Sequence, residues 1–367
     1  MTVKDVANIH YGKALKKDDR VESGDIDVFG SNGAVGIHDE FLFDEPTVII
    51  GRKGSVGKTI YTEDESWTID TAFYSEIDKS KIVIKYFYYA LMSKDMEKYA
   101  ITTSIPGINR NDIYNLKIPL PSLEEQKAIV AKLDRAQRLI DIDKEMLAKY
   151  DQLIQSMFLE MFGDPVTNPK GWERFDIHGL ASGEKNSIKA GPFGSSLKKE
   201  FYVEKGYKIY GQEQVIRDDF NYGDYYINQE RFEKLKNCEI KKDDVLISLV
   251  GSYGYISVVP EGIERGIINP RLMKISFEKD KVLPFFFKSL FTNESFEKLI
   301  EDQTHGGTMG ILNTTIVKKL NIPVPPISLQ ESFLNKLKAI KGEMSEIEKS
   351  LKKSKDLFSS LLQGVFG

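Results

Sequence analysis

The stretch IPLPSLEEQKAIV at residues 118–130 returns in altered form as IPVPPISLQESFL at residues 322–334. The two copies align without a gap at an offset of 204 residues (322 − 118). The same offset relates the Phe-Gly pairs at residues 162–163 and 366–367. An offset that persists over the whole of such a segment indicates an internal duplication. The chain therefore divides near Gly163 into two halves that end in the same module.

Each copy of the module predicts a long helix. Proline precedes the expected start, and in the first copy acidic residues fill the first turn. Apolar residues then recur at alternating steps of four and three, with one charged exception in the first copy, Asp143, and one polar exception in the second, Ser354. Such a pattern is typical of a coiled coil. The expected pairing residues are Ile129, Leu133, Ile140, Leu147, Ile154, Leu337, Ile340, Met344, Ile347 and Leu351.

The two apolar stripes most simply pair with each other. A stripe that only faces a core would look similar, but a helix of roughly 40 residues measures about 60 Å and exceeds what one small core covers. Because one whole half of the chain separates the two helices, we expect an antiparallel pair related by a pseudo-twofold axis.

The two remaining parts predict diverged copies of one α+β domain. A β-branched run precedes a glycine-rich loop in each, at residues 48–57 and again at residues 245–254. An aromatic run follows in both, at residues 86–91 and 285–290. The expected fold class is α+β, with two globular domains separated by two long antiparallel coiled-coil helices. The predicted boundaries are 1–121 and 164–326 for the domains and 122–163 and 327–367 for the helices.

Composition excludes several classes of protein. The chain has 367 residues, 51 Lys and Arg against 55 Asp and Glu, and a formal net charge of −4, which argues against a DNA binder held by bulk charge. A single cysteine, Cys238, excludes an internal disulfide and a Cys-cluster zinc site. We expect a cytoplasmic protein without a membrane partner, because no secretory leader or bilayer-length apolar run is present. The histidines lack ligand spacing; they are His10, His38, His178 and His305.

Basic and amide side chains gather around the glycine-rich loops. Such clusters are commonly ordinary solvated surface, but backbone near glycine can approach a phosphate closely. Arginine pairs with guanine, and asparagine and glutamine pair with adenine. The candidate DNA-binding residues of the first domain are Lys13, Lys16, Asn32, Arg52, Lys53, Lys58 and Arg110. Those of the second domain are Lys189, Ser195, Ser196, Lys198, Gln212, Gln214 and Arg271.

Two motifs come close to catalytic patterns and fail. Gly57-Lys58-Thr59 ends like a phosphate-binding loop, but the first glycine is one position off and a strand, not a helix, is expected to follow. The sequence Asn269-Pro270-Arg271 lacks the second proline and the aromatic of an amino-methyltransferase motif. We therefore expect no catalytic residues.

The whole organisation resembles the specificity subunit of type I restriction–modification enzymes. The resemblance rests on the repeated segment from Ile118, on Gly191-Pro192-Phe193-Gly194-Ser195, and on the Phe-Gly ends of both helices. It implies two target recognition domains that each read half of a split double-stranded DNA sequence, and paired helices that fix the gap. It also implies that this chain is non-catalytic and holds no cofactor. Two modification subunits would bring S-adenosylmethionine, and two restriction subunits would bring ATP and Mg.

Two alternatives remain open at this point. A coiled-coil scaffold without a nucleic-acid role would explain the helices but not the duplicated domains. A self-contained enzyme that binds a nucleotide or another cofactor would be recognised by binding of labelled cofactor to the isolated chain.

Overall fold

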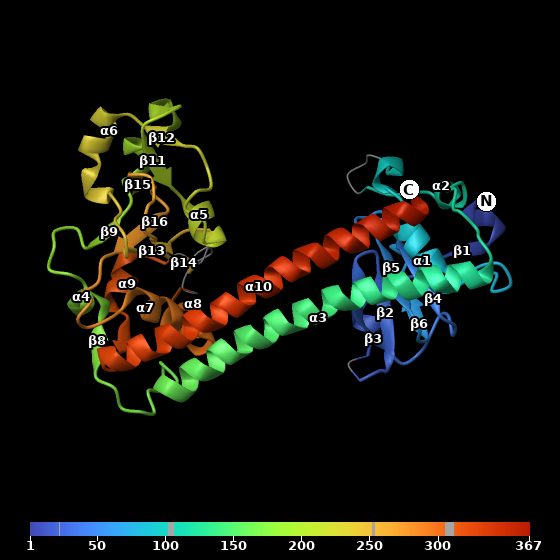
Figure 1. The fold of residues 1–367 in the computed structure, drawn as a ribbon, viewed down its shortest axis with the longest axis horizontal. Helices are drawn as coiled ribbons and strands as arrows, with labels where there is room; N and C mark the ends of the chain where they lie inside the picture. Colours follow the sequence, from blue (N-terminus) through green and yellow to red (C-terminus); the bar gives the residue numbers. More distant parts are fainter. Residues whose placement is uncertain (22, 102–105, 252–253, 305–311) are drawn as a thin grey trace. The chain divides into compact units, whose positions relative to one another are not determined.

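The structure is a computed structural model, and it describes residues 1–21, 23–101, 106–251, 254–304 and 312–367 (Figure 1). The chain forms two compact units. Unit 1 consists of Met1–Met146 and Ile347–Gly367, and unit 2 consists of Leu147–Glu346. Each unit therefore contains one globular part together with a segment of both long helices. Among the described residues, no helix is long and apolar enough to span a membrane.

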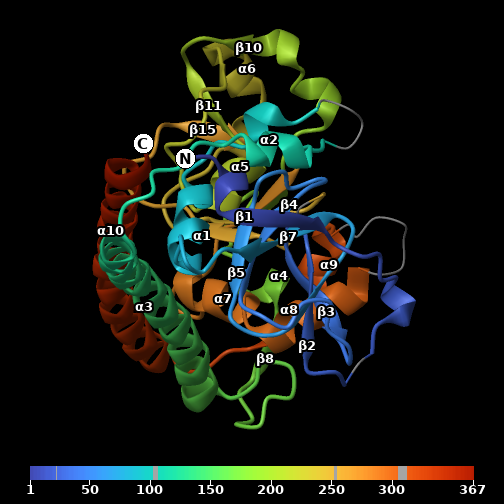
Figure 2. The same cartoon turned by 90° about the vertical axis from the view of Figure 1, so that its right-hand side faces the viewer.

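Unit 1 is built on a four-stranded antiparallel sheet, here called its core sheet. Its strand order is β1 (Ala7–Tyr11), β7 (Ala72–Ile77), β4 (Thr47–Gly51) and β5 (Thr59–Thr62). All of β4 is buried, as its β-branched residues favour. Helix α1 (Ile84–Met92) covers one face of this sheet (Figure 2).

A smaller sheet completes unit 1. Its order is β3 (Gly33–His38), β2 (Ile26–Gly30) and β6 (Ser66–Thr68), and β2 and β6 run parallel. The remaining elements are short: η1 (Val3–Asp5), η2 (Lys17–Asp19), η3 (Glu97–Tyr99) and α2 (Arg110–Tyr114).

Unit 2 contains the same core sheet. Its order is β9 (Ile188–Ala190), β16 (Leu272–Ile275), β13 (Val245–Ser248) and β14 (Ile256–Val258), again with antiparallel neighbours. Helix α7 (Pro284–Phe291) takes the place of α1 after the last strand. The duplicated α+β fold expected from the sequence is thereby confirmed.

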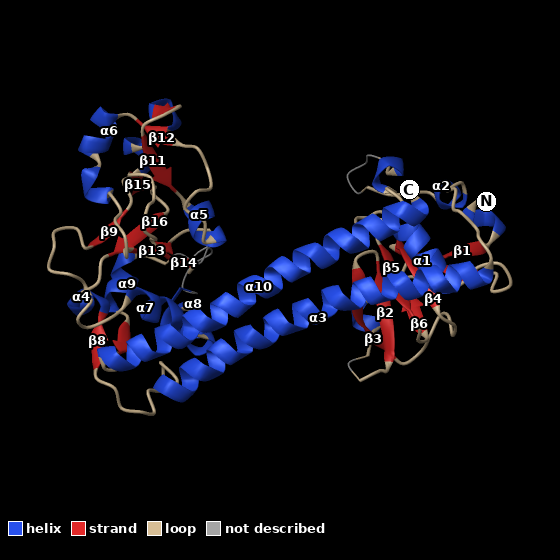
Figure 3. Ribbon diagram, viewed as in Figure 1, coloured by secondary structure: helices blue, strands red, loops and turns tan. Residues whose placement is uncertain are grey.

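The second sheet of unit 2 is larger than that of unit 1. Its order is β10 (Tyr202–Val203), β12 (Tyr226–Ile227), β11 (Tyr207–Tyr210) and β15 (Gly266–Ile268), and β11 and β15 run parallel as β2 and β6 do. Figure 3 shows α7 and α8 (Glu294–Thr304) beside the first part of α10 (Ile327–Phe366), with β11 and β12 on the other side of the core sheet. The remaining elements are β8 (Arg174–Asp176), α4 (Ile177–Leu180), η4 (Gly194–Ser196), η5 (Lys199–Phe201), α5 (Gln212–Arg217), α6 (Gln229–Lys234), η6 (Lys236–Cys238), α8 (Glu294–Thr304), α9 (Thr314–Lys319) and β17 (Asn321–Pro323).

The long helices are α3 (Leu123–Phe162) and α10 (Ile327–Phe366). In unit 1 the beginning of α3 shares a hydrophobic core with the end of α10, including Leu133 and Phe366. In unit 2 the end of α3 meets the beginning of α10, where the ring of Phe333 lies 5.3 Å from that of Phe162. Opposite ends meet in both units, so the expected antiparallel pairing is confirmed.

The predicted pairing residues of the two helices are buried to different extents. Leu133, Ile140 and Leu337 are buried, and the other predicted pairing residues are half-buried, because two helices alone cannot enclose the seam between them. The half-buried residues are Ile129, Leu147, Ile154, Ile340, Met344, Ile347 and Leu351.

The two polar exceptions in the apolar stripes are partners. In unit 1 the hydroxyl of Ser354 donates a hydrogen bond to Oδ2 of Asp143 over 3.3 Å. Ser354 is 8% exposed. A polar pair within an apolar seam favours one alignment of the helices, because any shift would bury these groups against apolar neighbours.

Candidate nucleic-acid interface

The glycine-rich loops of the two units are closed by the same backbone hydrogen bond. In unit 1 the N–H of Gly57 donates to the carbonyl of Gly51 over 2.8 Å. In unit 2 the N–H of Gly254 donates to the carbonyl of Ser248 over 3.0 Å. Each loop closes an antiparallel strand pair, β4–β5 or β13–β14. Part of the second loop, residues 252–253, lies outside the described residues.

Each loop is also held by the segment that leads towards a long helix. The N–H of Ile108 donates to the carbonyl of Arg52 over 3.0 Å, and the N–H of Leu312 donates to that of Leu249 over 3.1 Å. Arg52 and Leu249 are therefore equivalent positions. The loops are fixed at both sides, which suits them to present side chains in a defined direction.

A glycine directly follows strand β1 in unit 1 and strand β9 in unit 2. The N–H of Gly12 donates to the carbonyl of Ala72, and the N–H of Gly191 donates to that of Leu272. A Cβ atom at either glycine would collide with the backbone of a neighbouring strand end, at Ile69 in unit 1 and Asn269 in unit 2. Both positions require glycine because the two backbones approach so closely.

In unit 1 the structure brings two candidate arginines to one aromatic ring. The guanidinium carbons of Arg52 and Arg110 lie 4.9 and 5.2 Å from the ring centre of Tyr11, which is 49% exposed. Each guanidinium also donates to a backbone carbonyl, Arg52 to Asp70 over 2.9 Å and Arg110 to Ile9 over 3.4 Å. These bonds orient two cations while leaving donors free for nucleic acid.

The other candidates of unit 1 lie around the same loop to differing degrees. Nζ of Lys58 donates to the backbone and side-chain oxygens of Asn32 over 2.7 and 2.8 Å. Lys53 is exposed on the loop, and Lys13 lies with Nζ 5.4 Å from the ring centre of Trp67. Lys16 is exposed just before η2, and no contact of its side chain joins it to this group among the described residues.

In unit 2 an amide and a guanidinium form the corresponding group. Nε2 of Gln212 donates to the hydroxyl of Ser248 and to the carbonyl of Val250, both over 2.5 Å. Its Oε1 accepts from Nη1 of Arg271 over 3.3 Å. The side-chain amide is thereby fixed between the loop and Arg271, with the arginine exposed.

Gln214 has a different position from the other candidates of unit 2. It is 4% exposed, its Oε1 accepts from the N–H of Gly211, and its Nε2 donates to the carbonyl of Tyr222. Both halves of its amide are used to hold the start of α5. We therefore leave it out of the interface proposed below.

The remaining candidates of unit 2 lie near Gly191 in the chain. Ser195 and Ser196 are in η4, and Lys198 follows it and lies 3.7 Å from a carboxylate oxygen of Glu200. Lys189 is half-buried in β9.

Two aromatic residues at this surface escaped the sequence analysis. Tyr11 precedes Gly12, and Phe193, at 88% exposure, precedes Gly194. An exposed aromatic side chain can stack on a base. The adjacency of aromatic and glycine is the signal that could have found them.

Strand β2 of unit 1 and strand β11 of unit 2 each run parallel to a neighbouring strand, and they also end alike. The carbonyls of Phe29 and Tyr210 accept from equivalent N–H groups over 2.9 and 2.8 Å. Two residues further on, Ser31 and Gln212 are therefore equivalent. Both positions border the glycine-rich loop, since Ser248 receives the Gln212 bond and the carbonyl of Ser31 lies beside Gly51.

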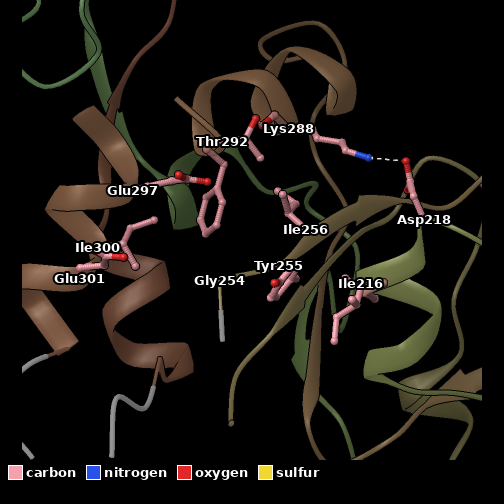
Figure 4. Close-up of a pocket in the computed structure, with 12 residues that line it drawn as sticks. Ile216, Asp218, Gly254, Tyr255, Ile256, Lys288, Thr292, Glu297, Ile300 and Glu301 are labelled. Atoms are coloured by element: carbon pink, nitrogen blue, oxygen red, sulfur yellow. Dashed lines mark hydrogen bonds and ion pairs between the residues drawn. The ribbon is translucent and has the colours of Figure 1, made fainter. Parts of the chain in front are cut away.

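Unit 2 also contains a cavity of about 450 Å³, which is an alternative candidate site (Figure 4). Lys288 and Asp218 form an ion pair over 2.7 Å on one side, and Glu297 and Glu301 of α8 lie on the other. Burial opposes ionisation of Asp218, but hydrogen bonds from Lys288 and Ser257 outweigh it and lower its pKa. Burial raises the pKa of Glu297. Lys288 is already paired with Asp218, so the described residues that line this cavity give no nucleophile–base pair.

The described residues give no metal cluster of three or more His, Cys, Asp or Glu, and His305 lies outside them. The loop at Gly57-Lys58-Thr59 runs into strand β5, and its N–H groups at Gly57 and Lys58 donate to carbonyls of Gly51 and Ser55 within the loop. A phosphate-binding loop instead points such groups at its ligand from the start of a helix.

Comparison with known proteins gives a consistent family. The model of the type I restriction modification DNA specificity domain matches residues 1–150 and 169–354. The MjaVIII specificity subunit of Methanocaldococcus jannaschii is 22% identical over 84% of this chain and 74% of its own length. The EcoBI specificity subunit of Escherichia coli is 21% identical over 87% of this chain and 71% of its own. The S subunit of a type I restriction–modification system from M. genitalium has the same fold, with a TM-score of 0.57, 18% identity and coverage of 100% and 95% of the two chains.

Proposed function

The chain belongs to the family of type I restriction modification DNA specificity domains, and we propose that it selects the DNA sequence for a restriction–modification complex. The observation that carries the proposal is the pair of core sheets. Each ends in the same glycine-constrained edge and fixed loop, but the two edges carry different polar side chains. A common backbone with different side chains is what two readers of different half-sites require.

Each globular part is proposed to read one half of a split duplex sequence. In the first, Arg52 and Arg110 can donate to guanine or phosphate, and Tyr11 holds them together. In the second, Gln212 and Arg271 offer an amide and a guanidinium side by side. Exposed lysines near both edges would neutralise phosphates, and partner subunits would supply the rest, in keeping with the net charge of −4.

The paired helices are proposed to fix the gap between the half-sites. Readers on one face of a duplex need a separation close to a helical turn, about 34 Å, and a stiff helix pair holds a distance that a flexible linker does not. Two modification subunits are proposed as partners, bringing S-adenosylmethionine for methylation of adenine N6. Two restriction subunits would bring ATP and Mg. We propose no catalytic step for this chain's own residues.

The test is co-expression with the methyltransferase subunit, followed by single-molecule sequencing of N6-methyladenine in the host DNA. We expect methylation at a two-part motif with one fixed gap. Exchange of either globular part for that of a relative should change one half of the motif and leave the other half unaltered.

Two outcomes would contradict the proposal. Methylation at a continuous motif would remove the two-reader arrangement. A stable complex that methylates nothing and shows no preference for any duplex would favour the coiled-coil scaffold instead.

A further inference from the structure

Gln126, in the first turn of α3, has an unusual environment for an amide side chain. It is 0% exposed. Its Oε1 accepts from the N–H of Val83 over 2.8 Å, and its Nε2 donates to the carbonyls of Lys81 and Pro121, each over 2.9 Å. Val83 directly precedes α1 as its N-terminal capping residue, and Pro121 precedes α3. One amide therefore joins the starts of two helices.

Gln330 repeats this arrangement in unit 2. It is also 0% exposed, and its Oε1 accepts from the N–H of Leu283 over 2.9 Å. Its Nε2 donates to the carbonyls of Lys281 and Pro325 over 2.9 and 2.8 Å. Leu283 directly precedes α7 as its N-terminal capping residue. The same three bonds thus join α10 to its own domain.

A buried glutamine at both positions is an unfavourable choice of residue if its role is stability alone. A buried amide must satisfy its donors and acceptor, and an apolar residue could fill the same space without that requirement. Much of the surrounding sequence differs between the two copies, as Glu124-Glu125 against Ser328-Leu329 illustrates. An amide, unlike an apolar side chain, forms hydrogen bonds that require a defined geometry. These bonds therefore fix the angle between the two helices that they join.

We infer that Gln126 and Gln330 are positioning residues that set the angle at which each long helix leaves its recognition domain, and thereby the permitted gap between DNA half-sites. This inference rests on the proposed function. The angle matters because the helix is long: a tilt of about 5° at one end displaces the other end of a 60 Å helix by about 5 Å. Successive base pairs are about 3.4 Å apart, so a small change of angle corresponds to a whole base pair.

The experiment compares the methylation pattern of the assembled complex with that of Gln126→Asn and Gln330→Asn variants. Asparagine keeps the amide but is one methylene shorter, so it cannot reach all three partners. We expect each variant to retain both half-sites but to methylate targets whose gap differs by one base pair, with the preference for the native gap reduced about tenfold or more. Gln152→Ala, at an exposed glutamine of α3, is the matched control and should leave the gap unchanged.

Gln126→Glu provides a second variant. Its carboxylate keeps the acceptor for Val83 but loses the two donated bonds. It should also relax the gap, and thermal melting of each complex reports whether the variant has merely lost stability. If the assembled variants only methylate the native targets less, and methylate no targets with another gap, the inference is overturned.

Failure of this inference differs from failure of the proposed function. If the wild-type complex shows no split motif, the proposed function fails. If the wild-type gap is fixed and remains fixed in every assembled glutamine variant, only the positioning role fails. If neither asparagine variant assembles, the glutamate variant decides; and if that too fails to assemble, the glutamines are required for folding and the positioning role is rejected.

Discussion

The two globular parts share one backbone at the edge proposed to read DNA, and they differ in which positions of that edge carry the charged side chains. In unit 1 the guanidinium comes from the loop, at Arg52, whose backbone N–H donates to the carbonyl of Thr71 over 2.9 Å. In unit 2 the equivalent N–H, that of Leu249, donates to the carbonyl of Arg271. The guanidinium there belongs to Arg271, the residue that accepts the bond. Each domain thus carries an arginine on this hydrogen-bonded pair of positions, but on opposite members of the pair. The shared property is therefore the backbone, and the side chains vary upon it.

The largest expected effect comes from substitutions that distort the backbone shared by the two domains. Gly12→Ala and Gly191→Ala should each lower the free energy of unfolding by about 3 kcal/mol, because the added methyl group collides with backbone atoms. Chemical denaturation measures the change. Gly194→Ala is the control, since nothing lies within 4 Å of a Cβ at that position. A large effect at only one of the two strand-end glycines would mean that the edges are not equivalent.

Next comes the pair of guanidinium groups. Arg52→Ala should weaken binding of the assembled complex by about 2 kcal/mol at the first half-site, and Arg271→Ala by a similar amount at the second. Leu249→Met, a volume-conserving change at the position equivalent to Arg52, should change the affinity little, because the buried Leu249 side chain offers no donor to DNA. The measurement is a gel-shift titration on duplexes altered in one half-site at a time. Equal losses on both half-sites from either variant would show that these residues bind phosphate rather than bases.

A smaller difference is expected at Phe193, whose equivalent in unit 1 is Ala14. Phe193→Ala should cost about 1 kcal/mol of affinity if the ring stacks on a base, and Phe193→Tyr should retain it. Fluorescence of 2-aminopurine in the second half-site would report the contact directly. An unaltered signal in the alanine variant would remove Phe193 from the interface.

The smallest effect concerns the two helices. Ser354→Ala should lower the free energy of unfolding by about 0.5 kcal/mol through loss of its bond to Asp143. A double-mutant cycle with Asp143→Ala isolates the coupling between the two side chains. A coupling energy of zero would mean that the seam is aligned by its apolar residues alone.

Patterns that repeat along the chain could be predicted from the sequence. The 4-3 spacing gives the helices, and the β-branched run before a glycine-rich loop gives β4 and β13. The identical offset in both halves gives the duplication. These features depend on local periodicity, which a single sequence contains. The strands β10 and β12 of unit 2 were not predicted, since two residues each carry too little periodicity.

Contacts between distant residues could not be predicted. Tyr11 meets Arg52 and Arg110 only because the sheet brings three separate segments together. Gln214 resembled Gln212 in the sequence, and only burial separates a structural amide from an accessible one. Gln126 was visible as a repeated residue, but nothing local indicates that its partners lie near Val83.

The division of the helices between the two units has a consequence for how the chain acquires its structure. Phe366, at 4% exposure, packs against Tyr86 with ring centres 5.0 Å apart, and its carbonyl accepts from Nζ of Lys94 over 3.0 Å. The core of unit 1 thus includes residues that are synthesised after all of unit 2. During synthesis unit 1 must wait for residues Ile347–Gly367, whereas unit 2 has all its residues by Glu346. Maturation should therefore run against the direction of translation, with the second reader complete before the first.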